Sequence, residues 1–433
     1  MFVADFFEME EKCNLFDLKS NEGFPLWDII RFEVYGKYTS FEASHISRNK
    51  FLLLLISVVG MVKVFFSFFS FLFRKAPILI FPNSRYLDEN EKLFDKSCEN
   101  VIGHIKEKYI IVERFKALKK YRYPVEYNYV LFYKSIASSK CSLPDVIVDQ
   151  IINSLIGYLG EAKITKDEIN KIYRNFIKEY SYYRFLFKLK RARKVYFVLN
   201  GIQKGMIAAA HSLNMEIHEF QHGKIDKAHL AYSYPISISR GSQTISPDVF
   251  YTMGSLWGKG LNIPTEIIPL GNDYFAISAH SNVEKDNSLL FISSFLHESY
   301  LSALAIDFIE KFPSVKIKYK LHPGEYRDVK KYEKRFSAYS NISVLKNEIS
   351  ISELISKATI VVLIDSTALH ETLNQGGKVA IYKRFNYELN SNCFNFPNVY
   401  LIDNVDDLKK AYDAPTIDSK EIFFDKFDLS KLK

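Results

Sequence analysis

The chain has 433 residues, of which 48% are hydrophobic and 25% charged, which excludes a disordered or fibrous protein and suits two domains of roughly 200 residues each. Its net charge of +8 suits an acidic partner such as anionic lipid, nucleotide phosphate or nucleic acid, without choosing among them. The four cysteines lie far apart, with no CxxC pair and no zinc-site spacing, which favours reduced thiols over a disulfide framework. No basic region leads into an apolar run at the N-terminus, which argues against secretion.

Residues 1–76 are predicted to form an N-terminal helical segment that contains a membrane-associating stretch, 51–73. Early in this segment Trp27, Ile30 and Val34 fall at helical spacing, which predicts one packed helix face.

The stretch 51–73 is apolar except for Lys63, and Arg74-Lys75 follow it. About 20 residues can span a bilayer, but a lysine near the centre of a spanning helix costs about 3 kcal/mol. Three interpretations remain open: an interfacial or hairpin-like anchor, a buried helix of a soluble domain, and a spanning helix. We favour the anchor, with peripheral association at the cytoplasmic face of the inner membrane, because Lys63, Arg74 and Lys75 can pair with anionic headgroups.

Residues 77–277 are predicted to form a Rossmann-like domain. Its expected strands and helices are, in chain order, strand 78–81, strand 109–112, helix 146–158, helix 166–188, strand 195–199, helix 205–213, strand 216–220, strand 248–254 and strand 267–270. The strand–helix–strand unit from 195 to 220 is typical of a parallel sheet. It brings Gln221-His222-Gly223-Lys224 to the carboxyl edge of that sheet, where ligands of such folds bind.

The basic run Lys188–Lys194 ends the long predicted helix. Such a run is typical of a solvated helix C-terminus, where the helix dipole favours cations. A second membrane-facing patch is the alternative.

Residues 288–433 are predicted to form a second Rossmann-like domain, after a polar linker at 278–287. Its expected strands are 289–292, 315–321, 359–364, 378–382 and 399–402. The last twenty residues show no clear element.

His322-Pro323 follows the second of these strands. The proline ends the strand and leaves the imidazole at the sheet edge, where it can hydrogen-bond or neutralise a phosphate oxygen. A histidine bonded to its own backbone loop is the structural alternative.

Ser366-Thr367 follows the strand 359–364 and precedes a helix, so either hydroxyl can cap that helix. Two hydroxyls at a helix N-terminus also suit a phosphate, and we favour that interpretation. Glu371, about one turn further on, can accept hydrogen bonds from ribose hydroxyls or be an ordinary solvated acid. The stretch 289–371 is therefore predicted to hold the nucleotide half of an activated sugar.

His222 is the candidate general base of the first domain, because Gly223 permits a turn that presents the imidazole to the space between the domains. Glu219 is a weaker candidate for the same role, and a structural histidine is the alternative for His222. The sequence has no Walker loop, no GxGxxG after a strand, no GxSxG elbow, no DxD pair after an apolar strand and no recognisable nucleic-acid module. We therefore expect no metal, no cofactor and no nucleic acid.

At these motifs the chain resembles bacterial surface-polysaccharide glycosyltransferases of the GT-B class, over roughly residues 194–382. The CMP-sugar-using sialyl- and Kdo-type transferases and the CDP-glycerol glycerophosphotransferases are the most similar families. They share a His-Pro pair and a Ser/Thr pair that hold the cytidine nucleotide's phosphate, and here His322-Pro323 and Ser366-Thr367 look like these pairs. The His-Gly of the glycerophosphotransferases, whose histidine is the proposed base, is similar to Gln221-His222-Gly223. The sialyltransferases' acidic base motif is absent here.

The resemblance implies an α/β fold with two Rossmann-like domains facing across a cleft, the first for the acceptor and the second for the nucleotide-sugar. It implies a metal-independent transferase that moves a CMP-linked sugar of Kdo or nonulosonate type to a capsule, O-antigen or lipopolysaccharide glycan, free or lipid-linked. The nucleotide is then expected against Ser293, His322, Pro323, Ser366 and Thr367, with Glu371 near the ribose. A CDP-polyol phosphotransferase, a UDP-sugar transferase and a non-catalytic scaffold of an envelope polysaccharide complex remain as alternatives.

Overall fold

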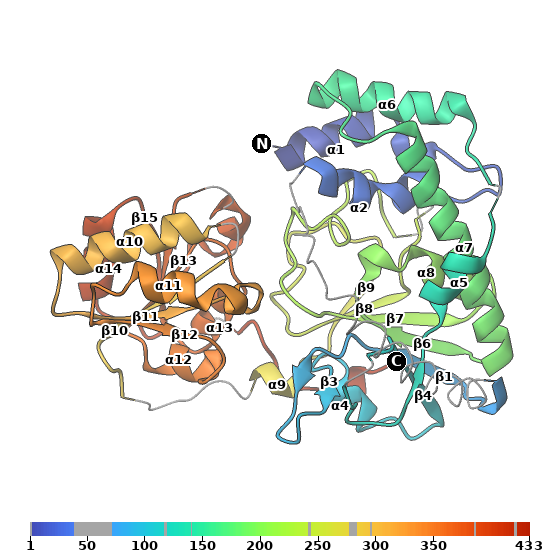
Figure 1. The fold of residues 1–433 in the computed structure, drawn as a ribbon. Helices are drawn as coiled ribbons and strands as arrows, with labels where there is room; N and C mark the ends of the chain where they lie inside the picture. The colour runs from blue at the N-terminus through green and yellow to red at the C-terminus, as the bar shows by residue number, and fades with distance from the viewer. Residues whose placement is uncertain are drawn as a thin grey trace.

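The computed structural model describes residues 2–38, 72–116, 119–139, 141–240, 244–276, 284–294, 297–384, 387–419 and 422–433. They form two α/β units, one built on a seven-stranded sheet and the other on a six-stranded sheet (Figure 1). Every strand pair in these two sheets is parallel. The prediction of an α/β protein with two Rossmann-like domains is therefore confirmed.

The first sheet has the strand order β5-β4-β1-β6-β7-β8-β9. Its strands are β1 (Ile78–Phe81), β4 (Tyr109–Glu113), β5 (Val125–Tyr127), β6 (Lys194–Phe197), β7 (Glu216–Phe220), β8 (Val249–Thr252) and β9 (Glu266–Pro269). From β1 the chain adds strands first on one side, as β4 and β5, and then on the other side from β6 onward, so the strand order reverses between β1 and β6. In doubly wound folds, ligands bind outside the carboxyl ends of the strands at such a reversal. The short strand β5 and the hairpin β2 (Tyr86–Leu87) and β3 (Leu93–Phe94) were not predicted.

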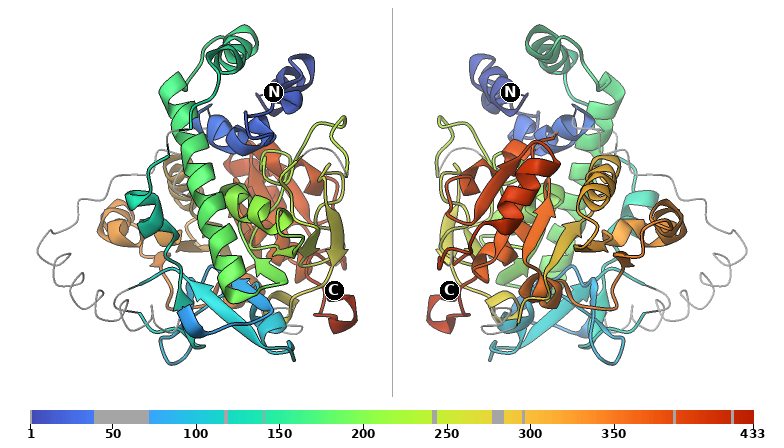
Figure 2. Two further views of the ribbon diagram at one scale, coloured as in Figure 1. Left: turned by 90° about the vertical axis from the view of Figure 1, so that its right-hand side faces the viewer. Right: turned by 90° about the vertical axis from the view of Figure 1, so that its left-hand side faces the viewer.

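Helices cover the first sheet because its buried strands carry apolar side chains on both faces. Leu79 and Phe81 of β1 face a core that contains α6 (Asp145–Leu159), α7 (Lys166–Lys190) and α8 (Lys204–His211). Ile78 and Ile80 face the opposite side, with the short helix α4 (Glu99–Ile102). The long helix α7 runs along the first face, with α5 (Val130–Ile136) beside it (Figure 2).

The N-terminal helices α1 (Phe2–Lys12) and α2 (Leu26–Tyr38) belong to the same core. Trp27, Ile30 and Val34 are fully buried, as their spacing predicts. Arg31 of α2 is buried against Glu10, with 2.7 Å between Nε and Oε1, and it donates to the carbonyls of Leu230 and Ser233. The interpretation of 1–76 as a segment apart from the first domain is therefore wrong for these two helices, because the Arg31 hydrogen bonds and the buried ion pair of Asp28 with Lys204 join them to it.

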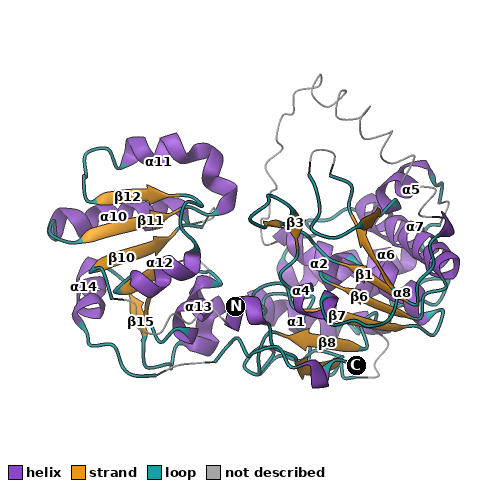
Figure 3. Ribbon diagram, turned by 90° about the horizontal axis from the view of Figure 1, so that it is seen from below, coloured by secondary structure: helices purple, strands orange, loops and turns teal. Residues whose placement is uncertain are grey.

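The second sheet has the strand order β12-β11-β10-β13-β14-β15. Its strands are β10 (Ser288–Ile292), β11 (Lys316–Lys320), β12 (Ile342–Leu345), β13 (Ile360–Leu363), β14 (Lys378–Tyr382) and β15 (Val399–Ile402). The helices α10 (Glu298–Lys311), α11 (Val329–Arg335) and α14 (Val405–Asp413) pack on one face, and α12 (Ile351–Lys357) and α13 (Ala368–Asn374) on the other. Figure 3 shows the strands of both units between their helices. Of these strands β12 was not predicted, and the reversal here lies between β10 and β13.

The last residues of the chain return to the first domain. Asp425 N donates to Met253 O at 2.9 Å, and Asp428 N donates to Leu270 O at 2.9 Å. The predicted range 288–433 assigns this tail to the second domain, which is wrong for its last residues, because the tail is bonded to loops around β8 and β9. Gly271 permits this crossing, since its φ is +80° and an added Cβ would overlap the carbonyl of Lys426.

Among the described residues, no helix is long and apolar enough to cross a membrane. Residues 51–71 of the stretch predicted to associate with membranes lie outside the described residues, as does most of the predicted linker 278–287.

Gly271→Ala should lower the free energy of unfolding by about 1–3 kcal/mol through backbone strain alone. The loss should be larger than that, because the added Cβ also displaces the tail. Thermal unfolding measures this loss. The matched control is Gly160→Ala, which has the same φ of +80° but nothing within 4 Å of the added Cβ. Equal losses in the two variants would contradict the close approach of the tail.

Candidate functional site

The reversal of the second sheet is flanked by the loops that follow β10 and β13. The loop after β13 carries Asp365, Ser366 and Thr367, as the sequence predicts. Ser366 Oγ accepts a hydrogen bond from Ala368 N at 3.2 Å and so caps α13, whereas the Thr367 side chain is exposed. Ser366 therefore fits the capping interpretation. The hydroxyl of Thr367 stays accessible and remains the candidate for binding a phosphate.

His322 lies exposed after β11 and begins the short helix η3 (Pro323–Asp328). Its Nδ1 accepts a hydrogen bond from Gly324 N at 3.1 Å, and its own N donates to Glu325 Oε2 at 2.8 Å. Because Nδ1 is an acceptor, the neutral ring carries its proton on Nε2. The local backbone bond therefore orients an exposed Nε2–H donor, and Pro323 fixes the turn that holds it.

Ser293 does not join these residues through its side chain. It is 2% exposed, and its Oγ donates to Glu325 Oε1 at 3.0 Å. Tyr332 donates to the same oxygen at 2.5 Å. The expectation that Ser293 contacts a nucleotide is therefore not supported by its placement, since its hydroxyl is used to hold Glu325 and, through it, the backbone of His322.

His222 follows β7 on the first domain. Gln221 holds this turn, because its amide donates to Gly223 O at 2.8 Å and accepts from Met253 N at 2.8 Å. His222 Nδ1 is buried and has no hydrogen-bond partner among the described residues. Burial, together with the nearby His229 and Arg85, lowers the pKa of His222 to about 4. The imidazole is therefore neutral at physiological pH, which is the form that a general base requires.

The loop after β1 supports His222 from the side. Arg85 donates to the carbonyl of His222 at 2.8 Å. That loop is held by two buried acids, since Ser84 N donates to Glu113 Oε1 at 3.1 Å and Asn83 N donates to Asp95 Oδ2 at 2.6 Å. Burial raises the pKa of Glu113 to about 7. Sequence analysis missed this support because the acids lie in loops or at a strand end, where no periodicity marks them.

Glu219 is fully buried within β7. Its Oε1 accepts from Tyr232 OH at 2.5 Å and from Asn200 N at 2.9 Å. Burial raises its pKa to about 7. Because Glu219 is fully buried whereas His222 is only half-buried, the structure gives Glu219 a supporting place rather than the predicted catalytic one.

Lys224 joins the two loops that carry the predicted residues. Its ammonium lies 2.5 Å from Asp365 Oδ1 and 2.9 Å from Asn390 Oδ1 on the second domain, and 3.2 Å from Asp226 on the first. Burial alone would lower the pKa of Lys224, but the carboxylates of Asp365 and Asp226 outweigh it and raise the pKa. The turn Gln221-His222-Gly223-Lys224 and the turn Asp365-Ser366-Thr367 are therefore bonded to each other.

One further acid, Glu371, and one further histidine, His297, also have shifted pKa values. Burial raises the pKa of Glu371 to about 7, and Lys96 of the first domain opposes the rise. His297, at the start of α10, is 1% exposed and its Nδ1 has no partner among the described residues. Burial lowers the pKa of His297, and Asp365 opposes that shift. Glu371 was predicted, whereas His297 was missed because it follows a strand by five residues with no motif around it.

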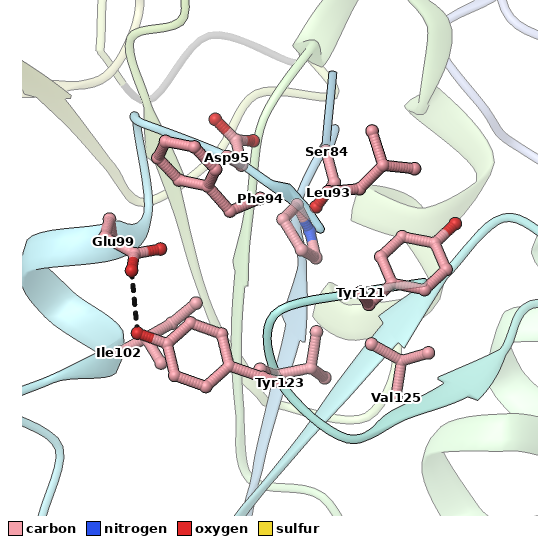
Figure 4. A pocket seen from close by; sticks show the side chains of 11 residues that line it. Ser84, Leu93, Phe94, Asp95, Glu99, Ile102, Tyr121, Tyr123 and Val125 are labelled. Carbon is pink, nitrogen blue, oxygen red and sulfur yellow. Dashed lines mark hydrogen bonds between the residues drawn. The ribbon is translucent and has the colours of Figure 1, made fainter. Parts of the chain in front are cut away.

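A small cavity lies between the loop after β1, the hairpin β2–β3 and the start of β5 (Figure 4). Glu99 in its wall accepts from Tyr123 OH at 2.7 Å and from Arg122 at 2.6 Å. Asp95 in the same wall accepts from the backbone of Ser97 at 2.8 Å. The cavity therefore belongs to the network that holds the hairpin β2–β3 and the loop after β1.

No protein-family model and no curated protein matches the chain. Among solved structures, the chain is similar to a UDP-GlcNAc 2-epimerase from Methanocaldococcus jannaschii, at 11% identity and a TM-score of 0.45, over 79% of this chain and 93% of that one. It is also similar to the UDP-GlcNAc 2-epimerase from Neisseria meningitidis bound to UDP-GlcNAc, at 11% identity and a TM-score of 0.45, over 80% and 95%. A glycosyltransferase from Rickettsia africae gives 9% identity and a TM-score of 0.42, over 79% and 88%. These similarities concern the general fold and not the substrate of this chain.

Within the described ranges, no group of three or more His, Cys, Asp or Glu side chains is placed to hold a metal ion.

Lys224→Met should lower the free energy of unfolding by about 1–3 kcal/mol, because it leaves Asp365 without its charged donor. Differential scanning calorimetry measures the loss. Lys311→Met is the matched control, since its pair with Asp406 is exposed on both sides and should be worth at most about 1 kcal/mol. If the two variants unfold alike, the bond between the domains does not stabilise the native state.

Proposed function

We propose that the protein is a GT-B glycosyltransferase that moves a sugar from a nucleotide-activated donor to a hydroxyl of a bacterial surface glycan. The observation that carries the proposal is the bond from Lys224 to Asp365, which joins the loop of the half-buried His222 to the loop of Ser366-Thr367. Sugar transfer between two bound substrates requires a base beside the acceptor hydroxyl and polar donors beside the departing phosphate, and here these groups lie on opposite domains.

The donor nucleotide binds the second domain. Loops after β11 and β13 are separated by β10, so His322 and Thr367 lie on loops about 10 Å apart at the sheet edge. The Nε2–H of His322 and the hydroxyl of Thr367 donate to phosphate oxygens, and Glu371 accepts from ribose hydroxyls. These fixed donors stabilise the charge that develops on the departing phosphate, with no metal in the proposed reaction.

The acceptor, a free or lipid-linked glycan, binds over the first domain. The neutral imidazole of His222 takes the proton of its hydroxyl as the sugar moves to the acceptor oxygen. The low pKa of His222 keeps the ring unprotonated before substrate enters. The phosphate that arrives opposite the ring favours the protonated form, which provides the driving force for proton transfer.

The donor we propose is CMP-linked, of Kdo or nonulosonate type, and the acceptor a capsule, O-antigen or lipopolysaccharide glycan at the cytoplasmic face of the inner membrane. These finer assignments rest on the sequence motifs His322-Pro323, Ser366-Thr367 and Gln221-His222-Gly223. A CDP-polyol phosphotransferase shares the same base and phosphate site and is the second candidate.

Nucleotide binding is tested by thermal shift with CMP, CDP, UDP and GDP. A ligand at 100 times its dissociation constant should stabilise the native state by about 2.7 kcal/mol, and we expect CMP or CDP to give the largest shift. Thr367→Val should remove the response, whereas Thr359→Val, at the other end of β13, should keep it. No response to any of the four nucleotides would favour a non-catalytic scaffold.

His222→Asn should lower kcat by about 10²–10⁴ and leave nucleotide affinity unchanged, since the imidazole acts on the acceptor proton. Steady-state rates and calorimetric titration with nucleotide measure the two quantities, with His211→Asn, at the exposed end of α8, as control. Equal losses of rate and nucleotide affinity would contradict the assigned roles.

The pH dependence follows from the pKa of about 4. Because the base acts as neutral imidazole, kcat/KM should stay level from pH 8 to about pH 5 and fall as His222 becomes protonated below that range. A fall centred near pH 6.5, the ordinary histidine value, would show that the free enzyme's base is another group.

A further inference from the structure

Three segments of the first domain that contain no acidic residue meet on one surface. The segments are 72–77, 130–139 and 180–194. Ala76 N donates to Lys190 O at 3.2 Å, and Arg193 N donates to Pro77 O at 2.8 Å. Lys178 of α7 donates to the carbonyl of Lys134 in α5 at 2.9 Å. These bonds join the segments into one surface, which we call the α5–α7 surface; Figure 2 shows its two helices side by side.

Large apolar side chains project from the α5–α7 surface. Leu131, Phe132 and Ile136 of α5 are 65%, 64% and 64% exposed. Phe185 of α7 is 57% exposed and Phe73 is 75% exposed. The opposite side of α5 packs on α7, where Tyr133 lies against Tyr182 with 5.7 Å between ring centroids. The outward face of α5 is therefore apolar where a solvated helix would be polar, which marks an interaction surface.

Basic side chains flank these apolar ones. Arg184, Lys188 and Arg191 are exposed along the C-terminal part of α7. No Asp or Glu occurs between Glu179 and Glu216. Exposed aromatic and aliphatic side chains beside lysines and arginines complement a bilayer of anionic lipid, whose acyl region takes the former and whose headgroups take the latter.

The path of the chain also favours a lipid bilayer as the partner of this surface. The described residues resume at Leu72, immediately after the apolar sequence 51–71, and Phe73 and Arg74 follow it on the α5–α7 surface. Arg193 and Pro77 adjoin the first residues of β6 and β1, so the basic end of the surface lies at the amino edge of the sheet.

We propose that the α5–α7 surface docks the protein on anionic lipid bilayers, with Leu131, Phe132, Ile136 and Phe185 entering the interface and Arg184, Lys188 and Arg191 pairing with headgroups. The inference rests on the membrane location proposed above and is independent of the transfer reaction. It provides a second contact besides residues 51–73, and two contacts hold a protein at a membrane far longer than one.

The test uses the full chain and sedimentation with vesicles of phosphatidylcholine alone or of phosphatidylcholine mixed with the anionic lipid phosphatidylglycerol. Arg184→Glu/Lys188→Glu should weaken partitioning onto the anionic vesicles by about tenfold or more, since each basic residue near the surface contributes about 1 kcal/mol. Leu131→Ser/Phe132→Ser should weaken it on both vesicle types. Neither change should alter the thermal shift produced by nucleotide, which separates this surface from the proposed site.

Matched controls come from exposed residues elsewhere. Lys330→Glu/Lys334→Glu on α11 makes the same change of charge, and Val146→Ser/Ile156→Ser on α6 makes the same kind of apolar change. Both controls should partition within about twofold of the unaltered chain. Unchanged partitioning of the α5 and α7 variants would overturn the proposal. An early thermal transition of Leu131→Ser/Phe132→Ser with partitioning unchanged would also overturn it, because it would mean that the chain itself covers this face.

Discussion

The ion pair between Lys224 and Asp365 is the interaction on which the candidate site depends. Lys224 ends the turn after β7 on the first domain, and Asp365 begins the turn after β13 on the second. Asn390 completes the contact by accepting from Lys224 and donating to the carbonyl of Ile364 at 2.8 Å. A half-buried charge pair is costly to break, because the remaining charge keeps its desolvation cost without its partner. The pair therefore holds the two turns, and the residues beside them, at a fixed separation.

Apolar contacts and the chain's last residues reinforce this junction. Trp257 of the first domain packs on His370 of α13 with 4.4 Å between ring centroids, and Phe423 of the tail lies against both. The tail then bonds to the loops after β8 and β9. Because it leaves the second domain and adds to the first, the tail limits how far the domains can separate.

Burial sets the acid–base character of the groups around the junction. It lowers the pKa of His222 to about 4 and raises the pKa of Glu371 and Glu219 to about 7. These groups are thereby shifted toward their neutral forms, because the low dielectric of the interior disfavours charge. The exposed donors His322 and Thr367 and the charged pair Lys224–Asp365 remain as the polar features that an anionic ligand would meet.

The sequence by itself determined most strands of the two large sheets, because these are short apolar runs bounded by glycine, proline or polar residues. The strands β1, β7, β14 and β15 have the predicted bounds. It also determined which turns carry His222, His322 and Ser366-Thr367, since a parallel sheet brings the residues after its strands to one edge. The short strands β5 and β12 and the acids Glu113 and Asp95 gave no periodic signal. Only the tertiary structure decided that Lys224 meets Asp365, that Ser293 and Glu219 turn inward, and that the N-terminal helices and the tail complete the first domain. Those outcomes depend on contacts between residues more than one hundred positions apart or on the direction of a single side chain, and local sequence pattern determines neither.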